Sequence, residues 1–214
     1  MTRRNLALGG LAVLTALAAP AAAQTRLDRP GTIGLFLFGG YGTITGDSRY
    51  GLDFSDGTVF GLSARYTVAP HWALGLYFQS QRYGSKGPTP VECELPPTDR
   101  LSMTHVMGEV YYFRNRDTDA SQYVVLGLGF YRPEVHFQEE ELVSFPGENL
   151  SLMGGLGAEF FIRETWGIDL SGRAIAYYGD GVTVQEKQSC PELVGGKWSV
   201  GLSGQIGIML YILR

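Results

Sequence analysis

The sequence predicts an all-β fold, an eight-stranded antiparallel up-and-down barrel, and three observations support this prediction. Eight segments alternate apolar residues with small or polar ones, which is the period of two that places every second side chain of a strand on one face. Beyond residue 23 no segment has a convincing apolar period of 3.6 residues, so no helix is expected. Short and long connections alternate along the chain, as they do when barrel strands run up and down.

The first 23 residues are typical of an export signal and are set aside before the fold is considered. Arg3 and Arg4 form a positive start, residues 6–19 are apolar, and residues 21–23 are small, as a cleavage site requires. We expect a cleaved signal peptide over 1–23, a short periplasmic segment over 24–31 and one domain over 32–214. The paired arginines also fit the twin-arginine export route, although the rest of that motif is absent.

Each expected strand is an alternating segment that begins and ends at turn or loop residues. The second and third strands are joined by Ala-Pro-His, the fourth and fifth by about seven residues that include two Asp and one Ser, and the sixth and seventh by Arg-Glu-Thr. The other four connections are long and polar, rich in Gly, Pro, Asp and Glu. In order, the eight segments are residues 32–44, 58–68, 72–82, 101–114, 122–131, 150–162, 166–178 and 197–212.

The strand lengths favour a barrel that crosses a membrane. Each segment has roughly the 9 to 11 residues that a tilted strand needs to cross a bilayer, or more. Short turns at one end and long loops at the other are the organisation of bacterial outer-membrane barrels. With eight strands, both chain ends fall at the short-turn end, which we expect in the periplasm, and the long loops lie outside the cell.

The last segment shows which face meets lipid. One series consists of Gly, Ser, Gln and Met without a charge, which is a poor water-facing surface but fits the narrow interior of an eight-stranded barrel. The opposite series, from Trp198 to Ile212, contains no polar side chain. A soluble lipocalin-like barrel would need Lys and Glu on its outer series. It remains the rival class.

Aromatic residues gather near the strand ends of the apolar series, as interfacial girdles do. Ordinary strand propensity explains aromatic residues in strands but not their position at the ends. The predicted girdle comprises Tyr66, Trp72, Tyr112, Tyr123, Phe160 and Trp166 near the short turns, and Phe60, Phe130, Tyr178 and Trp198 near the long loops.

Few charged residues remain on the series predicted to face inward: Arg65, Glu109, Glu159, Asp169 and Arg173. A slip of one residue would turn them toward lipid, where an Arg costs about 2 to 4 kcal/mol at the midplane. Inside a barrel of low dielectric constant, two bases and three acids are expected to pair, and neighbouring hydroxyl and amide groups complete their hydrogen bonds.

The chain has two cysteines, and export places them in an oxidising compartment. Cys93 and Cys190 lie in polar connections, the second and fourth long loops. We expect a disulfide between them that crosses the mouth of the barrel; two free thiols or an intermolecular bond are the alternatives.

The pattern GLGAEFFIRETWGIDLSGRA, residues 155–174, resembles the small outer-membrane β-barrel superfamily of OmpA-like, OmpX-like and OmpW-like proteins. The resemblance covers the chain from residue 32 onward and rests on distributed pattern. It implies outer-membrane lipids and lipopolysaccharide as surroundings, the barrel-assembly machinery as a partner in biogenesis, and a monomer. Two features depart from the family: the chain ends in Arg214 rather than an aromatic residue, and no peptidoglycan-binding domain follows the barrel.

Composition and motifs argue against an enzyme or a nucleic-acid binder. Without Arg3 and Arg4, the 17 basic residues fall to 15 against 21 acidic ones, which disfavours nucleic acid. We expect no catalytic, cofactor or metal site: His71 lies in a turn, His105 points inward, and His136 lies in an acidic loop where divalent binding is the weaker interpretation. The expected function is a non-enzymatic envelope scaffold with four surface loops; the alternative is a small pore or a carrier of small or hydrophobic solutes, as OmpW-like proteins are thought to be.

Overall fold

The computed structural model describes residues 30–46, 54–86, 98–114, 120–137, 143–144, 149–163, 165–179 and 197–212. The expected signal peptide over 1–23 lies outside these ranges. Within them the chain forms eight long strands and one very short one. These are β1 (Ile33–Gly46), β2 (Phe54–Ala69), β3 (Trp72–Ser85), β4 (Thr98–Phe113), β5 (Ala120–Phe137), β6 (Val143–Ser144), β7 (Asn149–Arg163), β8 (Trp166–Gly179) and β9 (Lys197–Ile212).

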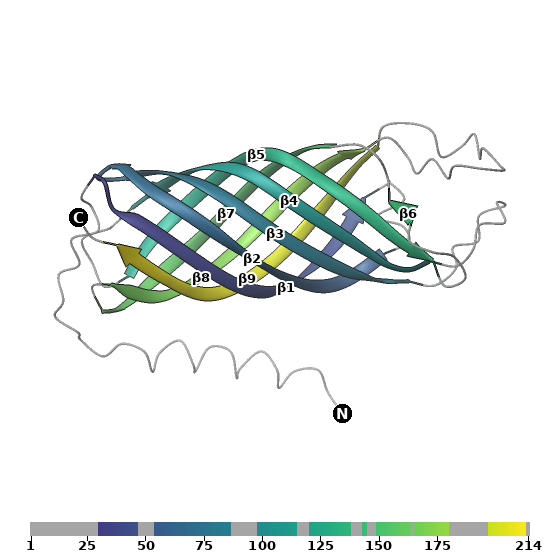
Figure 1. Cartoon of the computed structure of the whole chain (residues 1–214), viewed down its shortest axis with the longest axis horizontal. Helices are drawn as coiled ribbons and strands as arrows, with labels where there is room; N and C mark the ends of the chain where they lie inside the picture. The colour runs from purple at the N-terminus through teal and green to yellow at the C-terminus, as the bar shows by residue number, and fades with distance from the viewer. Residues whose placement is uncertain are drawn as a thin grey trace, which may run out of the picture.

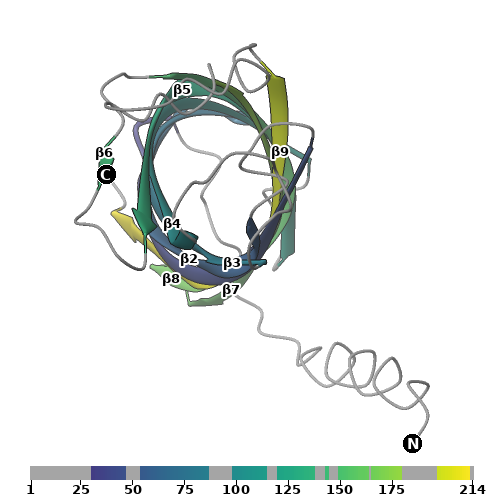
Figure 2. The same ribbon diagram turned by 90° about the vertical axis from the view of Figure 1, so that its right-hand side faces the viewer.

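The eight long strands close into one barrel, which confirms the predicted fold class (Figures 1 and 2). Each strand pairs antiparallel with the next long strand along the chain, and β9 pairs with β1. Viewed along its length, the barrel is a ring around a central lumen (Figure 2). The two residues of β6 pair only with the far end of β5, at Glu134 and Val135, and take no part in the ring.

The strands are strongly tilted, which Figure 1 shows and the register explains. The paired residues lead from Tyr112 on β4 through Val124, Leu156, Gly172 and Gly204, then Tyr41, Thr58 and Arg82, and back to β4 at Ser102. A path that follows paired residues once around the barrel therefore returns to β4 ten residues away from where it started. Such a stagger sets the tilt of a closed sheet, and eight strands leave an interior that side chains can fill.

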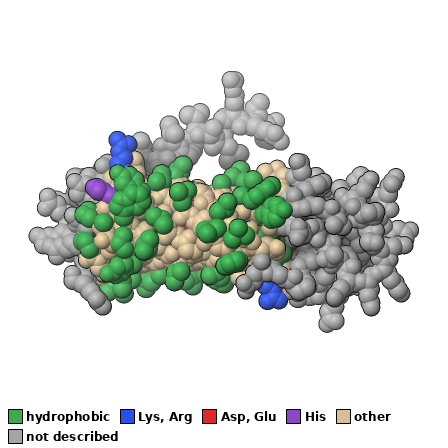
Figure 3. Space-filling model, turned by 90° about the horizontal axis from the view of Figure 1, so that it is seen from above, with side chains coloured by type: hydrophobic (Ala, Val, Ile, Leu, Met, Phe, Trp, Pro, Cys, Tyr) green, Lys and Arg blue, Asp and Glu red, His purple; other side chains and the backbone are tan. Residues whose placement is uncertain are grey.

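The outer wall is apolar. Large hydrophobic side chains point outward from every long strand, and several are more than half exposed, such as Leu126 at 70% and Leu156 at 68%. Figure 3 shows hydrophobic side chains gathered toward both ends of one face, with a band of backbone and small or polar side chains between them. An exposed apolar surface of this extent matches a lipid environment rather than water. No helix in the described ranges is long and apolar enough to span a membrane.

Some strands extend further toward the long loops than predicted. The sequence pattern predicts a second strand from residue 58 and a fifth strand that ends at 131, whereas β2 starts at Phe54 and β5 continues to Phe137. These extensions are paired, Phe54 with Ser85 and Phe137 with Thr98. Backbone pairing continues beyond the lipid-facing region, where apolar alternation is no longer needed, so the sequence pattern ends before the strand does.

Candidate functional site

The candidate site is the lumen, which polar and aromatic side chains of the inward series fill. Most of the buried polar residues are Ser, Gln, Arg, Glu and Asp of this series. They form three interaction groups, two centred on an arginine and one on tyrosines and glutamines. Each group connects strands on different sides of the ring.

The first group surrounds Arg65 on β2. Its guanidinium pairs with Glu159 on β7, and its Nη2 lies 3.2 Å from Asp169 Oδ2 on β8. Because β2 and β7 are four strands apart in either direction around the ring, the Arg65–Glu159 pair spans the full width of the lumen. The Tyr123 hydroxyl donates to Asp169 at 2.9 Å, and the Tyr211 hydroxyl donates to Glu159.

Aromatic rings enclose the same guanidinium. Arg65 Cζ lies 4.2 Å from the centroid of the Tyr111 ring and 4.9 Å from that of Tyr123. Arginine stacks well on such rings, and the interaction strengthens when water is excluded. Arg65 is 2% exposed and Glu159 is 1% exposed. The rings and the ion pairs together leave little open space beside this side chain.

The second group surrounds Arg173 on β8. Its Nη1 pairs with Glu109 on β4 and lies 3.1 Å from the Met153 sulfur, while its Nη2 donates to the Tyr111 hydroxyl at 3.3 Å. The Tyr111 hydroxyl donates in turn to Glu109. Arg173 Cζ also lies 4.2 Å from the centroid of the Tyr77 ring. Tyr111 therefore connects the two arginine groups.

The third group consists of uncharged side chains. Gln205 Nε2 on β9 donates to the Tyr77 hydroxyl at 2.9 Å and to Gln79 Oε1 at 3.0 Å, both on β3. A second set joins Gln81 on β3, which accepts from Tyr177 on β8 at 3.0 Å and from Tyr83 at 2.5 Å. Strands β3 and β8 also lie opposite each other in the ring. The Tyr177–Gln81 hydrogen bond is therefore a further contact between opposite walls of the lumen, in addition to the contact of Arg65 with Glu159.

The charges of the lumen compensate one another closely. All five predicted inward charges are buried, and the described contacts give each carboxylate an arginine and a tyrosine hydroxyl. A buried charge is tolerated only when it is paired and hydrogen-bonded. Two arginines and three acids leave one formal negative charge, which the donated tyrosine hydrogens partly offset.

The three histidines lie in different settings: His71 in a turn, His105 in the lumen and His136 on β5. The described residues contain no cluster of three or more His, Cys, Asp or Glu side chains that could hold a metal ion. His71 Nδ1 donates to the Phe113 carbonyl at 3.0 Å, consistent with a turn residue. His136 belongs to β5 rather than to a loop. The acidic residues 139–141, which follow His136 in the sequence, lie outside the described residues.

His105 is fully buried in the lumen, with its ring between two tyrosines. The ring centroid lies 6.0 Å from that of Tyr131 and 5.4 Å from that of Tyr177. Neither ring nitrogen has a hydrogen-bond partner among the described residues. Glu109, on the same inward face of β4, contacts Arg173 and Tyr111.

The structure corrects one predicted girdle residue, Tyr123. Its side chain is 3% exposed and lies in the lumen, where it donates to Asp169. The reason is that neighbouring residues of a strand face opposite sides. Gln122 and Val124 point outward from β5, so Tyr123 points inward, as Ser121 and Val125 do. The other nine predicted girdle residues lie on the outward face, with Phe160 and Trp166 half-buried and the rest exposed.

The sequence analysis predicts the five charged residues of the lumen but does not name most of its tyrosines and glutamines. The signal that could have identified Tyr111 and Tyr77 was their place on the inward series, two residues from Glu109 and Gln79 respectively. Their partners on distant strands could not be read from the sequence. Cys93 and Cys190, predicted to form a disulfide, lie outside the described residues.

Comparisons with known proteins agree with this architecture. The family model described as "Outer membrane protein beta-barrel domain" matches residues 9–204. Among solved structures, Neisserial surface protein A is similar at 15% identity and a TM-score of 0.57, covering 84% of this chain and 98% of that one. OprG from Pseudomonas aeruginosa is similar at 13% identity and a TM-score of 0.50, covering 87% and 98%. No curated protein sequence matches the chain. At these identities the structural likeness shows the fold alone.

Proposed function

Because the chain belongs to the outer membrane protein β-barrel domain family, we propose that it acts as a closed, non-enzymatic scaffold of the bacterial outer membrane. In this role the barrel anchors four long connections at one end and does not conduct solutes. The contact that carries the proposal is the Arg65–Glu159 pair, which joins opposite walls of the lumen.

The lumen contents support a closed state at more than one level. Beyond the Arg65 pair, Arg173 joins β8 to Glu109 on β4, and Tyr177 joins β8 to Gln81 on β3. An eight-stranded barrel has an interior just wide enough for its side chains. A solute would have to separate buried ion pairs, and breaking such a pair costs about 3 to 5 kcal/mol.

The orientation in the membrane is part of the proposal. The described chain starts beside the end of β2, where Gly31 donates to the Thr67 carbonyl, and Ile33 pairs with Ile212 near the other terminus. Both described ends therefore lie at the short-turn end. We place this end in the periplasm, after removal of residues 1–23, and the long connections outside the cell, where a Cys93–Cys190 bridge would join two of them.

A proteoliposome assay separates the scaffold from a pore or carrier. We expect vesicles with the full chain to swell in small sugars, and to take up an alkyl-chain fluorophore, no faster than protein-free vesicles. Faster swelling would establish a pore and contradict the proposal, whereas faster uptake of the alkyl probe alone would establish a carrier of hydrophobic solutes. A known open porin in parallel vesicles controls for the sensitivity of the assay.

A further inference from the structure

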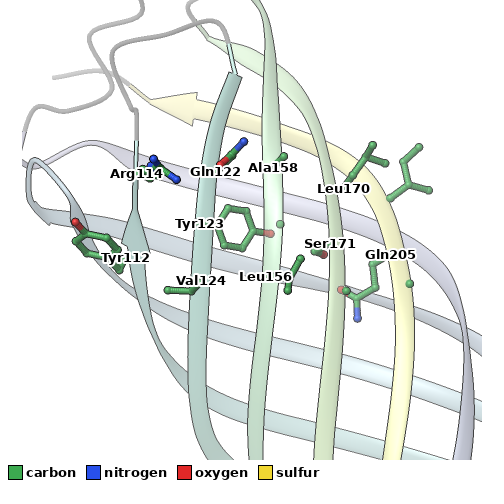
Figure 4. Close-up of a pocket in the computed structure, with 14 residues that line it drawn as sticks. Tyr112, Arg114, Gln122, Tyr123, Val124, Leu156, Ala158, Leu170, Ser171 and Gln205 are labelled. Atoms are coloured by element: carbon green, nitrogen blue, oxygen red, sulfur yellow. The ribbon is translucent and has the colours of Figure 1, made fainter. Parts of the chain in front are cut away.

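The outer wall is hollowed where β5, β7, β8 and β9 lie side by side. A groove of about 840 Å³ crosses these strands, with Val124, Leu156, Gly172 and Gly204 among its lining residues (Figure 4). A second hollow of about 720 Å³ shares Leu156, Gly172 and Gly204 and continues to Tyr41 on β1. The two form one surface depression on the face that meets lipid.

Two outward glycines form the floor of this groove, and the barrel itself does not require them. A methyl group added at Gly172 or Gly204 would meet no atom within 4 Å. Neither residue has a positive φ. An inward glycine differs: at Gly207 an added carbon would lie 2.1 Å from the Leu37 carbonyl oxygen. Glycine weakens a strand and often marks a place where a ligand or another chain approaches closely. At Gly172 and Gly204 the approach comes from outside the barrel.

One end of the groove is polar. Arg114, at the short-turn end of β4, lines it together with Tyr112 and Gln122, and the Arg114 amide donates to the Gln122 carbonyl at 2.8 Å. Figure 4 shows Arg114 and Gln122 near each other on neighbouring strands. The Arg114 side chain is exposed and has no carboxylate partner among the described residues. The groove thus begins with a cation and becomes apolar along its length.

The tilt of the barrel directs this groove into the membrane. The paired residues Tyr112, Val124, Leu156, Gly172 and Gly204 form one row across five strands. Because the strands are staggered, this row of paired residues moves away from the short-turn end as it passes around the barrel. It starts at Tyr112, two residues from Arg114. It reaches Gly204, which is eight residues from the end of β9 at Ile212. The polar end therefore lies at headgroup level and the glycine floor deeper in the hydrocarbon.

We propose that this groove is a specific site for an anionic phospholipid of the leaflet that adjoins the short turns. The lipid phosphate contacts Arg114, with Tyr112 and Gln122 as further donors, and one acyl chain lies across Gly172 and Gly204. A positive end at the membrane interface followed by an apolar trough is complementary to this class of molecule. A second copy of the chain fits less well, because its outward face would bring apolar side chains against Arg114.

Native mass spectrometry of the detergent-purified full chain tests the site. The protein is titrated with phosphatidylglycerol and with phosphatidylcholine of identical acyl chains, and the dissociation constant of the first bound lipid is measured. We expect phosphatidylglycerol to bind about fivefold more tightly, the effect of one arginine on an anionic lipid. Arg114→Gln should remove this preference, and the matched control Arg132→Gln at the opposite end of β5 should keep it.

The apolar floor is tested by filling it. The double variant Gly172→Leu, Gly204→Leu should weaken the binding of both lipids about tenfold, because the chain loses its close contacts. Gly108→Leu is the control, since this outward glycine lies outside the groove and its nearest atom is 3.9 Å from the added carbon. Equal affinities in all variants, or a wild-type dimer that the leucines convert to a monomer without changing lipid affinity, would overturn the proposal.

Discussion

At the residue scale, the lumen depends on buried charges that compensate one another. Arg173 and Glu109 are both fully buried as side chains and share Tyr111 as a hydrogen-bond partner. Taking such charges out of water is costly, so a well-formed buried pair contributes little net stability, but a single remaining charge is strongly destabilising. Removing one member of the pair should therefore lower the free energy of unfolding much more than removing both.

We expect Arg173→Met to lower the free energy of unfolding by about 3 to 5 kcal/mol, because Glu109 is left buried without its cation. Urea unfolding of the barrel in lipid vesicles measures the change. Combining it with Glu109→Met should recover most of the loss. Arg132→Met serves as the control, since its pair with Glu134 is 3.8 Å long and its side chain is 62% exposed. A single variant as stable as the wild type would show that the pair does not form.

His105 behaves differently, since its buried ring has no hydrogen bond to lose among the described residues. We expect His105→Phe to keep or raise the stability, because an apolar ring of similar shape can stack between Tyr131 and Tyr177 without an unpaired polar atom. The same unfolding assay measures it. A loss of more than about 2 kcal/mol would mean that the imidazole has a polar partner that the variant destroys.

At the scale of the strand, the alternation of side chains determines which residues face lipid and which fill the lumen. All eight segments and the inward position of the five charges followed from the period of two. The prediction for Tyr123 is wrong because closeness to a turn does not decide which face a side chain occupies, whereas its place in the alternation does. The contacts across the lumen that join β2 to β7 and β3 to β8 could not be predicted, since alternation within one strand does not specify which strand lies opposite it.

Inward glycines leave the space that the large side chains of the lumen occupy. A carbon added at Gly157 on β7 would lie 2.4 Å from Tyr123 Cζ, so the ring would have to leave Asp169. We expect Gly157→Ala to destabilise the barrel by about 1 to 3 kcal/mol. Gly172→Ala, outward on the neighbouring strand, is the matched control and should change little. Equal unfolding midpoints for the two variants would refute the assigned faces of β7 and β8.

At the scale of the whole molecule, a polar, filled interior and an apolar exterior invert the usual arrangement of a soluble barrel. Leu126 and Leu156 are more exposed to the surroundings than Arg65 or Asp169. This inversion is stable only when lipid covers the outer wall. The described lumen contacts join walls that a conducting pore would keep apart, which supports the closed scaffold that we propose.

Single-channel recording in planar bilayers tests the closed lumen most directly. We predict that the purified wild-type barrel, inserted at known density, gives no discrete current steps across the accessible voltage range. A variant with serine in place of Arg65, Gln81, Glu109, Glu159, Asp169 and Arg173, inserted at the same density, should give steps, because the side chains that join opposite walls are shortened and no unpaired buried charge remains. Stable, reproducible steps from the wild-type protein would contradict the account.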